Sequence, residues 1–173
     1  MGSLQYSLGC GMFRRILLVV MGIVAFGYSL YPVPTLQVRD LSGNRVLLSI
    51  PTSTGDQFGV SFINSVEKLP VTDYFCIDDR SRIIFSKIVY QAPYVGYIHE
   101  ERVEVRGKDL VISGIHKAME RVTFFNGYSA NHTLTFNGTS FPIHSMAPGG
   151  ALIEIAVGME TRLTSLLGKG KIL

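Results

Sequence analysis

The pattern of hydrophobic and polar positions begins with a long apolar run near the start of the chain. Arg14 and Arg15 precede this run, and the next charged side chain is Arg39. A helix that crosses a hydrocarbon core of about 30 Å needs roughly 20 apolar residues, and residues 16–33 come close to that length. The pattern predicts a transmembrane anchor or signal segment over residues 16–33, with residues 1–15 in the cytoplasm because basic residues favour that side.

Two other interpretations of this apolar run remain open. A cleaved signal peptide has the same basic start and short apolar core, although Ala25, Gly27 and Ser29 form no clear Ala-x-Ala cleavage site. A buried core helix is disfavoured because two arginines adjoin the run and strand-like sequence follows it. The anchor and the signal peptide would both export the rest of the chain.

From residue 34 to residue 158 the pattern changes to short β-rich runs separated by turn residues. Turn signals at intervals of roughly 8 to 12 residues are typical of an antiparallel sandwich or barrel. Asn137 and Gly138 indicate a tight type I′ hairpin, because both positions tolerate positive φ. We therefore expect an all-β domain, an antiparallel β-sandwich or open barrel, preceded by one N-terminal transmembrane helix. The expected strands cover residues 36–39, 45–50, 58–64, 71–78, 82–90, 102–106, 110–115, 119–125, 132–136, 139–143 and 152–157.

The end of the chain, residues 159–173, is expected to differ from the strands before it. Apolar positions recur at helical spacing over residues 160–167, which predicts one short helix. Lys169 and Lys171 then make a basic tail.

Composition and charge exclude several function classes. The chain has 173 residues, of which 47% are hydrophobic and 17% charged, so we expect one folded domain rather than a disordered chain. Removing Arg14 and Arg15 with the apolar segment reduces the 16 Lys and Arg residues to 14, against 13 Asp and Glu. Because no basic face remains, nucleic-acid binding is not expected. Cys76 is the only cysteine of the exported part, so no disulfide is expected within it.

No side-chain pattern points to a metal, a cofactor or a catalytic centre. The histidines are His99, His116, His132 and His144. Their spacing fits no zinc motif, and the position four residues after His99 is Val103 rather than a second histidine. Ser65 and Asp73 could imitate part of a nucleophilic triad, but no Gly-x-Ser-x-Gly turn accompanies them. We expect no catalytic residue, no metal site and no cofactor.

Two polar residues fall on the apolar face of a predicted hairpin. The alternation that places Phe58 and Phe62 inward also places Asn64 inward, and the alternation of the next strand places Asp73 among its apolar residues. A buried carboxylate is unfavourable unless it is paired. We therefore expect Asn64 to bond Asp73 across the hairpin, with Ser65, Glu67 and Lys68 completing the network. Replacement of Asp73 by alanine should then cost about 1–3 kcal/mol.

The segment that contains these residues, Phe62 to Asp73 with the sequence FINSVEKLPVTD, resembles the signature of the domain of unknown function 1850 family. That signature is a strand ending in His-Ser-Val, followed by an acid, a Pro-Val pair and a further acid. The resemblance extends more loosely to about Val157. It implies a small exported or membrane-anchored protein, often encoded beside the membrane subunits of TRAP transporters of the TAXI type, and it implies no biochemical role.

The match can be followed residue by residue. Ser65, Glu67 and Pro70 agree with the signature, Asp73 stands where the family usually has glutamate, and Asn64 replaces the histidine. Asparagine neither titrates near neutral pH nor replaces an imidazole as a metal ligand. We interpret these five residues as a structural motif that fixes the hairpin, with a ligand site as the alternative.

A further element of the signature is weak in this chain. The glycine-rich loop that the resemblance implies is represented only by Tyr94, Gly96 and Tyr97. If a ligand site exists, these residues are expected to join the corner formed by Asn64 and Asp73.

These observations lead to one functional hypothesis and two alternatives. We expect a non-catalytic accessory module in the cytoplasmic membrane, with a single span, its N-terminus inside and its β domain outside. Its expected partners are the membrane and a membrane subunit of a TAXI-type TRAP transporter. The alternatives are an extracytoplasmic domain that binds a small ligand and, third, an enzyme.

Overall fold

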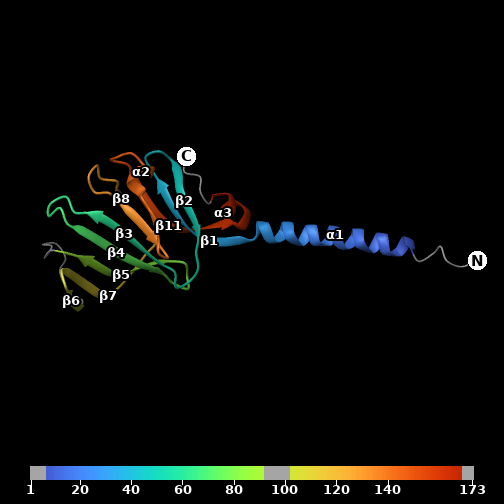
Figure 1. The fold of residues 1–173 in the computed structure, drawn as a ribbon, viewed down its shortest axis with the longest axis horizontal. Coiled ribbons are helices and arrows are strands. Elements are labelled where there is room, and N and C mark those ends of the chain that lie inside the picture. Colours follow the sequence, from blue (N-terminus) through green and yellow to red (C-terminus); the bar gives the residue numbers. More distant parts are fainter. Residues whose placement is uncertain (1–6, 92–101, 169–173) are drawn as a thin grey trace, which may run out of the picture.

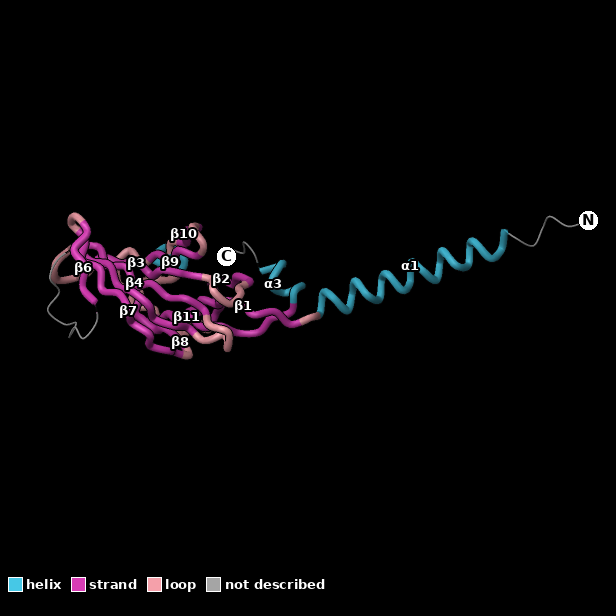
Figure 2. Tube along the Cα trace, turned by 90° about the horizontal axis from the view of Figure 1, so that it is seen from below, coloured by secondary structure: helices cyan, strands magenta, loops and turns pink. Residues whose placement is uncertain are grey.

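The protein consists of one long helix followed by a β domain (Figure 1). The computed structural model describes residues 7–91 and 102–168. The helix, α1 (Ser7–Leu30), extends away from the strands, as Figure 2 shows from a second direction. The β domain contains two sheets in which every pairing is antiparallel. The predicted all-β sandwich after one N-terminal apolar helix is confirmed.

The two sheets differ in width. The smaller sheet has the order β2-β1-β11-β8, and the larger sheet has the order β10-β9-β3-β4-β5-β7-β6. The strands of the smaller sheet are β1 (Pro32–Asp40), β2 (Arg45–Pro51), β8 (Arg121–Phe125) and β11 (Leu152–Thr161). Those of the larger sheet are β3 (Gln57–Ile63), β4 (Pro70–Ile77), β5 (Ile83–Tyr90), β6 (Arg102–Arg106), β7 (Asp109–Met119), β9 (Thr133–Phe136) and β10 (Thr139–Phe141).

The end of α1 lies three residues before the predicted end of the apolar segment. Only Tyr31 separates Leu30 from β1, and Pro32 already pairs with Thr161 of β11. Pro32 ends the helix because its ring nitrogen carries no hydrogen for a helical bond, whereas proline is tolerated as the first residue of a strand. Helix and sheet are therefore joined almost directly. The helix is long and apolar enough to cross a membrane over Met12–Leu30, and none of that stretch is buried in the protein.

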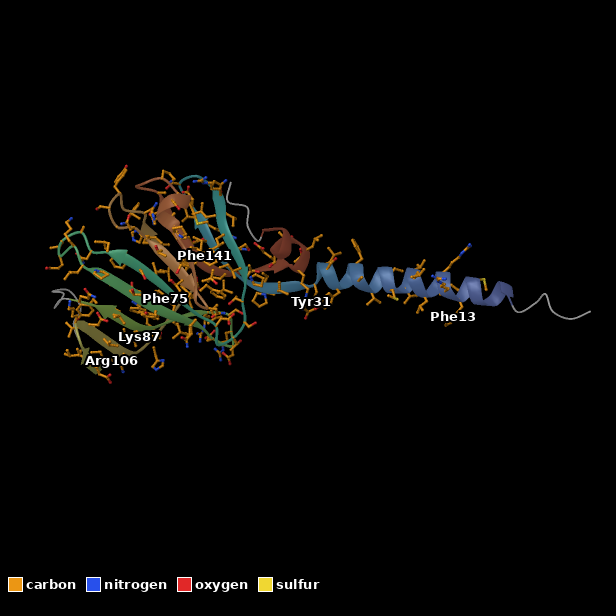
Figure 3. The ribbon with its side chains drawn as sticks, viewed as in Figure 1. Phe13, Tyr31, Phe75, Lys87, Arg106 and Phe141 are labelled. Carbon is orange, nitrogen blue, oxygen red and sulfur yellow. The ribbon has the colours of Figure 1, made fainter. Side chains whose placement is uncertain are left out.

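The main core lies between the two sheets. Phe58 of β3 stacks on Phe75 of β4 with 4.9 Å between ring centroids, and Phe75 also contacts the ring of Phe85; Figure 3 labels Phe75 among the strands of the larger sheet. The smaller sheet contributes aliphatic residues from its two central strands. Its fully buried members are Leu36, Val38, Ile153 and Ile155. The alternation of each strand sends these side chains to one face, so the two sheets bury a shared apolar layer.

The wider sheet carries a second apolar cluster on β4, β5 and β7. Its buried members are Val71, Ile88, Tyr90 and Ile112, with Phe62, Phe85, Leu110 and Ile115 packed against them. Neighbouring members pair across the strands, Val71 with Tyr90 and Ile88 with Ile112. The larger sheet thus continues its apolar face beyond the part that contacts the smaller sheet.

The C-terminal elements differ from prediction. The expected helix over residues 160–167 is α3 (Arg162–Gly168), because β11 continues through Glu160 and Thr161. Glu160 is held in the sheet by two hydrogen bonds: its Oε1 accepts one from Gln37 at 2.6 Å, and its Oε2 accepts one from Ser49 at 2.8 Å. A short helix that was not predicted, α2 (Ile143–Met146), begins where the strand over residues 139–143 was expected to end.

The predicted tight hairpin is confirmed. Asn137 has φ of 44° and Gly138 has φ of 83°, and Phe136 pairs with Thr139 across them. Two consecutive positive φ angles define the type I′ turn.

Candidate functional site

The five residues singled out from the sequence lie on and beside the connection between β3 and β4. Asn64 follows the last residue of β3, and Pro70 begins β4. Ile63 pairs with Pro70, so the connecting residues close the hairpin as a compact turn. Lys68, within the turn, has φ of 57°, a left-handed conformation that helps the chain reverse direction.

Asn64 organises this turn through local hydrogen bonds. Its side-chain Oδ1 accepts hydrogen bonds from the backbone N–H groups of Val66 at 2.7 Å and Glu67 at 3.2 Å. Its backbone N–H donates to the Leu69 carbonyl, and its own carbonyl accepts from Lys68. The residue is buried, with 7% of its surface exposed. Asn64 is therefore the centre of an Asx-type turn.

The other residues of the turn do not join a polar network. Ser65, Glu67 and Pro70 are exposed. Neither Ser65 nor Glu67 makes a side-chain hydrogen bond with any residue that the structure describes, so the predicted network with Lys68 is wrong. A small cavity of about 10 Å³ lies beside the turn, lined in part by Asn64, Glu67 and Tyr90. This space admits about one water molecule.

Removal of the Asn64 amide tests this account of the turn. Asn64→Ala should lower the free energy of unfolding by about 1–2 kcal/mol, because two backbone N–H groups lose a buried acceptor. Asn64→Asp keeps an acceptor oxygen and should lose less than the alanine variant. Chemical denaturation of both variants provides the measurement. Equal stability of wild type and Asn64→Ala would contradict the organising role of the amide.

Asp73 lies apart from the turn, on the inner face of the larger sheet. Its cross-strand neighbours are Val60 on β3 and Ile88 on β5. Across six of the seven strands the row reads Val103, Ile112, Ile88, Asp73, Val60 and Leu134. Asp73 is thus a single carboxylate in an otherwise aliphatic row, and the alternation of β4 correctly predicted its inward direction.

The predicted bond between Asn64 and Asp73 is wrong. The hairpin register places Asp73 opposite Val60, and the acceptor oxygen of Asn64 bonds the turn instead. Oδ1 of Asp73 is buried and has no hydrogen-bond partner. Burial disfavours the charged form and raises the pKa of Asp73 to about 6. The carboxyl group therefore titrates just below neutral pH.

A histidine that the sequence did not single out lies on the same side of the core. His132 is buried between two aromatic rings, with centroid distances of 4.6 Å to Phe124 and 5.5 Å to Phe62. Its Nδ1 is buried and has no hydrogen-bond partner. Burial, followed by the charge of His144, lowers the pKa of His132. The sequence could have predicted this inward direction, because His132 precedes Leu134 by two residues and alternation places both side chains on the same face of the sheet.

The structure does not bring a serine, an acid and a histidine together at the motif. Ser65 is on the exposed turn, Asp73 is in the aliphatic row, and His132 is stacked between phenylalanines. Within residues 7–91 and 102–168, no group of three or more His, Cys, Asp or Glu side chains is placed to hold a metal ion. His99 and the loop with Tyr94, Gly96 and Tyr97 lie outside the described residues.

A larger hollow occupies the outer face of the same sheet. It has a volume of about 390 Å³, and none of its lining residues is charged. These residues are Gly55, Gln57, Phe58, Gly59, Ser61, Thr72, Tyr74, Thr135, Asn137 and Gly138. We refer to this hollow as the Gly59 groove. Sequence reasoning missed it, because it depends on the register that aligns three strands.

Gly59 forms the floor of this groove. It pairs with Tyr74 on one side and with Thr135 on the other. A Cβ atom at this position would lie 3.4 Å from the Thr72 methyl group and 3.6 Å from the Tyr74 ring. The absence of a side chain therefore keeps the groove open. The Tyr74 ring has Lys87 Nζ at 4.2 Å from its centroid, and Figure 3 labels Lys87 on this sheet.

Comparison with known proteins places the motif in a wider context. The family model described as Domain of unknown function (DUF1850) matches residues 58–143. The match runs from β3 to the first residue of α2 and contains the turn at Asn64, the row at Asp73 and most of the Gly59 groove. No curated protein and no solved structure matches the chain. Residues 58–143 are thus similar to that family, whereas α1, β1, β2 and β11 lie outside the matched range.

Proposed function

We propose that the protein is a non-catalytic accessory module that α1 holds at the outer face of the cytoplasmic membrane. One observation carries the proposal: an unburied apolar helix passes directly into a central strand of the β domain. Met12–Leu30 is about 28 Å long as a helix, and its uncharged part, residues 16–30, is about 22 Å long, so the long side chains of Arg14 and Arg15 extend to the headgroups at the cytoplasmic end. Arg14 and Arg15, at the far end from the β domain, favour a cytoplasmic N-terminus.

The junction between helix and β domain supports a short, stiff tether. Tyr31 is the only connecting residue; its backbone N–H donates to Tyr28, and its carbonyl accepts from the backbone N–H of Arg162 at 3.1 Å. Figure 3 labels Tyr31 where α1 meets the strands. One extended residue spans only about 3.5 Å. The β domain therefore remains at the membrane surface, where lipids and membrane proteins are its nearest partners.

The proposed partner is a membrane subunit of a TAXI-type TRAP transporter, on the basis of the resemblance of Phe62 to Asp73. Purification of the full chain from native membranes in several mild detergents tests this proposal. A transporter subunit should co-purify with the wild-type chain. An insertion of ten Gly and Ser residues after Tyr31 should weaken that co-purification, because it releases the β domain from the membrane surface. Recovery of the wild-type chain alone in every detergent would contradict the proposal.

The Gly59 groove favours a second candidate function, the binding of a small neutral ligand. Its uncharged lining combines one tyrosine ring with hydroxyl and amide groups, a combination that suits a polyhydroxylated molecule. Binding of such a molecule in this groove would make the β domain an extracytoplasmic receptor.

Blocking the groove tests the second candidate. A panel of neutral sugars and polyols is screened for an increase in the melting temperature of the wild-type chain. Gly59→Leu fills the groove and should abolish any increase, whereas Ser113→Ala, elsewhere on the sheet, should preserve it. No increase with any compound, or the same increase in Gly59→Leu, would argue against ligand binding in this groove.

A further inference from the structure

A cavity of about 520 Å³ lies where α1 meets the β domain. Its walls come from the end of α1, the start of β1, the end of β2 and the first turn of α3. The lining residues are Tyr28, Ser29, Tyr31, Pro32, Val33, Pro34, Pro51, Thr52, Ser53, Arg162, Leu163 and Ser165. We refer to it as the junction cavity. Its volume falls in the range of ligand-binding pockets, which is about 300–1,000 Å³.

Arg162 supplies a positive charge to this cavity. Its guanidinium carbon lies 4.2 Å from the ring centroid of Tyr28 and 5.9 Å from that of Tyr31, and Nη1 donates to the Tyr28 hydroxyl. Its Nε is buried and has no hydrogen-bond partner. No carboxylate of the described residues forms an ion pair with it. The guanidinium group is thus held in place by tyrosines, with one donor unused and with no ion pair to any carboxylate in the part of the chain that the structure describes.

Ser165 supplies a second unused group on the same wall. It follows Arg162 by three residues on α3, so both side chains lie on one side of the helix. Only 1% of Ser165 is exposed, and its Oγ has no hydrogen-bond partner. A buried hydroxyl without a partner is unfavourable. Both unused donors lie just behind the cavity surface, so a small side-chain shift would let an anionic oxygen bound in the cavity accept hydrogen bonds from Ser165 Oγ and from Nε of Arg162.

The rest of the junction cavity has an apolar lining that matches a hydrocarbon chain, and the cavity lies at the end of the apolar helix, where a lipid would be found. Val33, Pro34, Pro51 and Leu163 contribute apolar walls. Tyr28 and Tyr31 lie at the end of the apolar helix, where aromatic side chains meet the lipid headgroups. A ligand that satisfies the whole cavity therefore combines a phosphate-like anion with an apolar part.

From these contacts we propose that the junction cavity binds the phosphate group of an anionic phospholipid, with Arg162 and Ser165 as the phosphate-binding side chains. The inference rests on the proposed crossing of the membrane by α1, because that crossing brings the cavity to the headgroup layer. A bound lipid would fill the space between helix and β domain, and it would fix the orientation of the domain on the membrane surface.

The test uses the purified full chain in detergent micelles, with no transporter present. Phosphatidylglycerol, phosphatidylcholine and inorganic phosphate are titrated separately, and bound molecules are counted by native mass spectrometry. Wild type should bind phosphatidylglycerol about tenfold more tightly than phosphatidylcholine, and Arg162→Gln should lose about tenfold in affinity for phosphatidylglycerol. Arg80→Gln, an exposed arginine on the β4–β5 turn, is the matched control and should bind as wild type does.

Each outcome decides the proposal. Arg162→Lys keeps the positive charge and is a smaller change than Arg162→Gln, so it controls for loss of folding. Intermediate affinity for phosphatidylglycerol in Arg162→Lys would support the site, and so would a loss of affinity in Ser165→Ala. Equal affinity for the two lipids, unchanged affinity in Arg162→Gln, or binding of inorganic phosphate without phosphatidylglycerol would overturn it. A missing transporter partner would leave this result unaffected, because the measurement involves the chain and lipid alone.

Discussion

Replacing Asp73 with asparagine should raise the free energy of unfolding at pH 7 by about 1–3 kcal/mol. The loss expected from the sequence for Asp73→Ala assumed a bonded carboxylate, whereas Oδ1 of Asp73 has no partner. A buried carboxylate without a partner is harder to ionise in the folded chain than in the unfolded chain, and its pKa rises from 3.8 to about 6. At pH 7 the group is ionised in both states, so the folded protein bears the cost of the poorly solvated charge. Asp73 is partly exposed, and solvent screening reduces that cost.

The pH dependence of stability provides the sharper form of this prediction. Because the folded-state pKa is above the unfolded one, the wild-type chain should lose stability as pH rises from about 4 to about 6, relative to Asp73→Asn. His132 acts in the opposite direction, since its lowered pKa means that stability falls as pH falls below about 6.5. Both proteins contain His132, so the difference between their stability curves isolates Asp73.

Urea denaturation of both proteins at half-unit pH steps gives these curves. Asp79→Asn, an exposed acid on the β4–β5 turn, is the control and should follow the wild type. If Asp73→Asn is less stable than wild type at pH 7, the carboxylate has a partner and the account of the aliphatic row is wrong.

The largest loss is expected for Phe58→Ala, at about 3–5 kcal/mol. Phe58 is 1% exposed and lies between the two sheets, stacked on Phe75. Its removal leaves a cavity in the layer that both sheets share, and the rigid strands around it collapse only in part. Thermal and chemical denaturation measure the loss. Val105→Ala, at a strongly exposed position of β6, is the control and should change stability by less than about 0.5 kcal/mol.

Both predictions depend on features that the sequence revealed in part. Alternation within each strand was sufficient to place Phe58 and Asp73 on the inner face, because side-chain direction along a strand is a local property. The apolar run and the Asn137-Gly138 hairpin were predictable for the same reason. The type of fold therefore followed from patterns a few residues long.

The partner of Asp73 could not be predicted, because partners depend on register. The sequence offered Asn64 as the nearest polar residue, but its amide oxygen lies within reach of the backbone N–H groups of Val66 and Glu67. Those local bonds close the turn, and the turn then fixes Asp73 opposite Val60. A local interaction that requires little ordering of the chain prevailed over a pairing between two strands.

Competition between local pattern and strand pairing also explains the shifted helix. The apolar spacing after Met159 is helical, yet Glu160 and Thr161 pair with the first residues of β1. The Gly59 groove and the junction cavity are formed by residues far apart in the chain, so no short sequence pattern predicts either of them. Such sites can be recognised only when the strand register and the spatial arrangement of the helices and strands are known.

The central claim is that α1 spans the membrane and leaves the β domain on the outer side. Alkaline phosphatase and green fluorescent protein, each fused after Leu173 of the full chain in a bacterial host, measure this directly, because the phosphatase needs an oxidising compartment for its disulfides. We predict an active phosphatase fusion and a dark fluorescent fusion, both in the membrane fraction. A bright fluorescent fusion with an inactive phosphatase would place the β domain in the cytoplasm and contradict the proposed function.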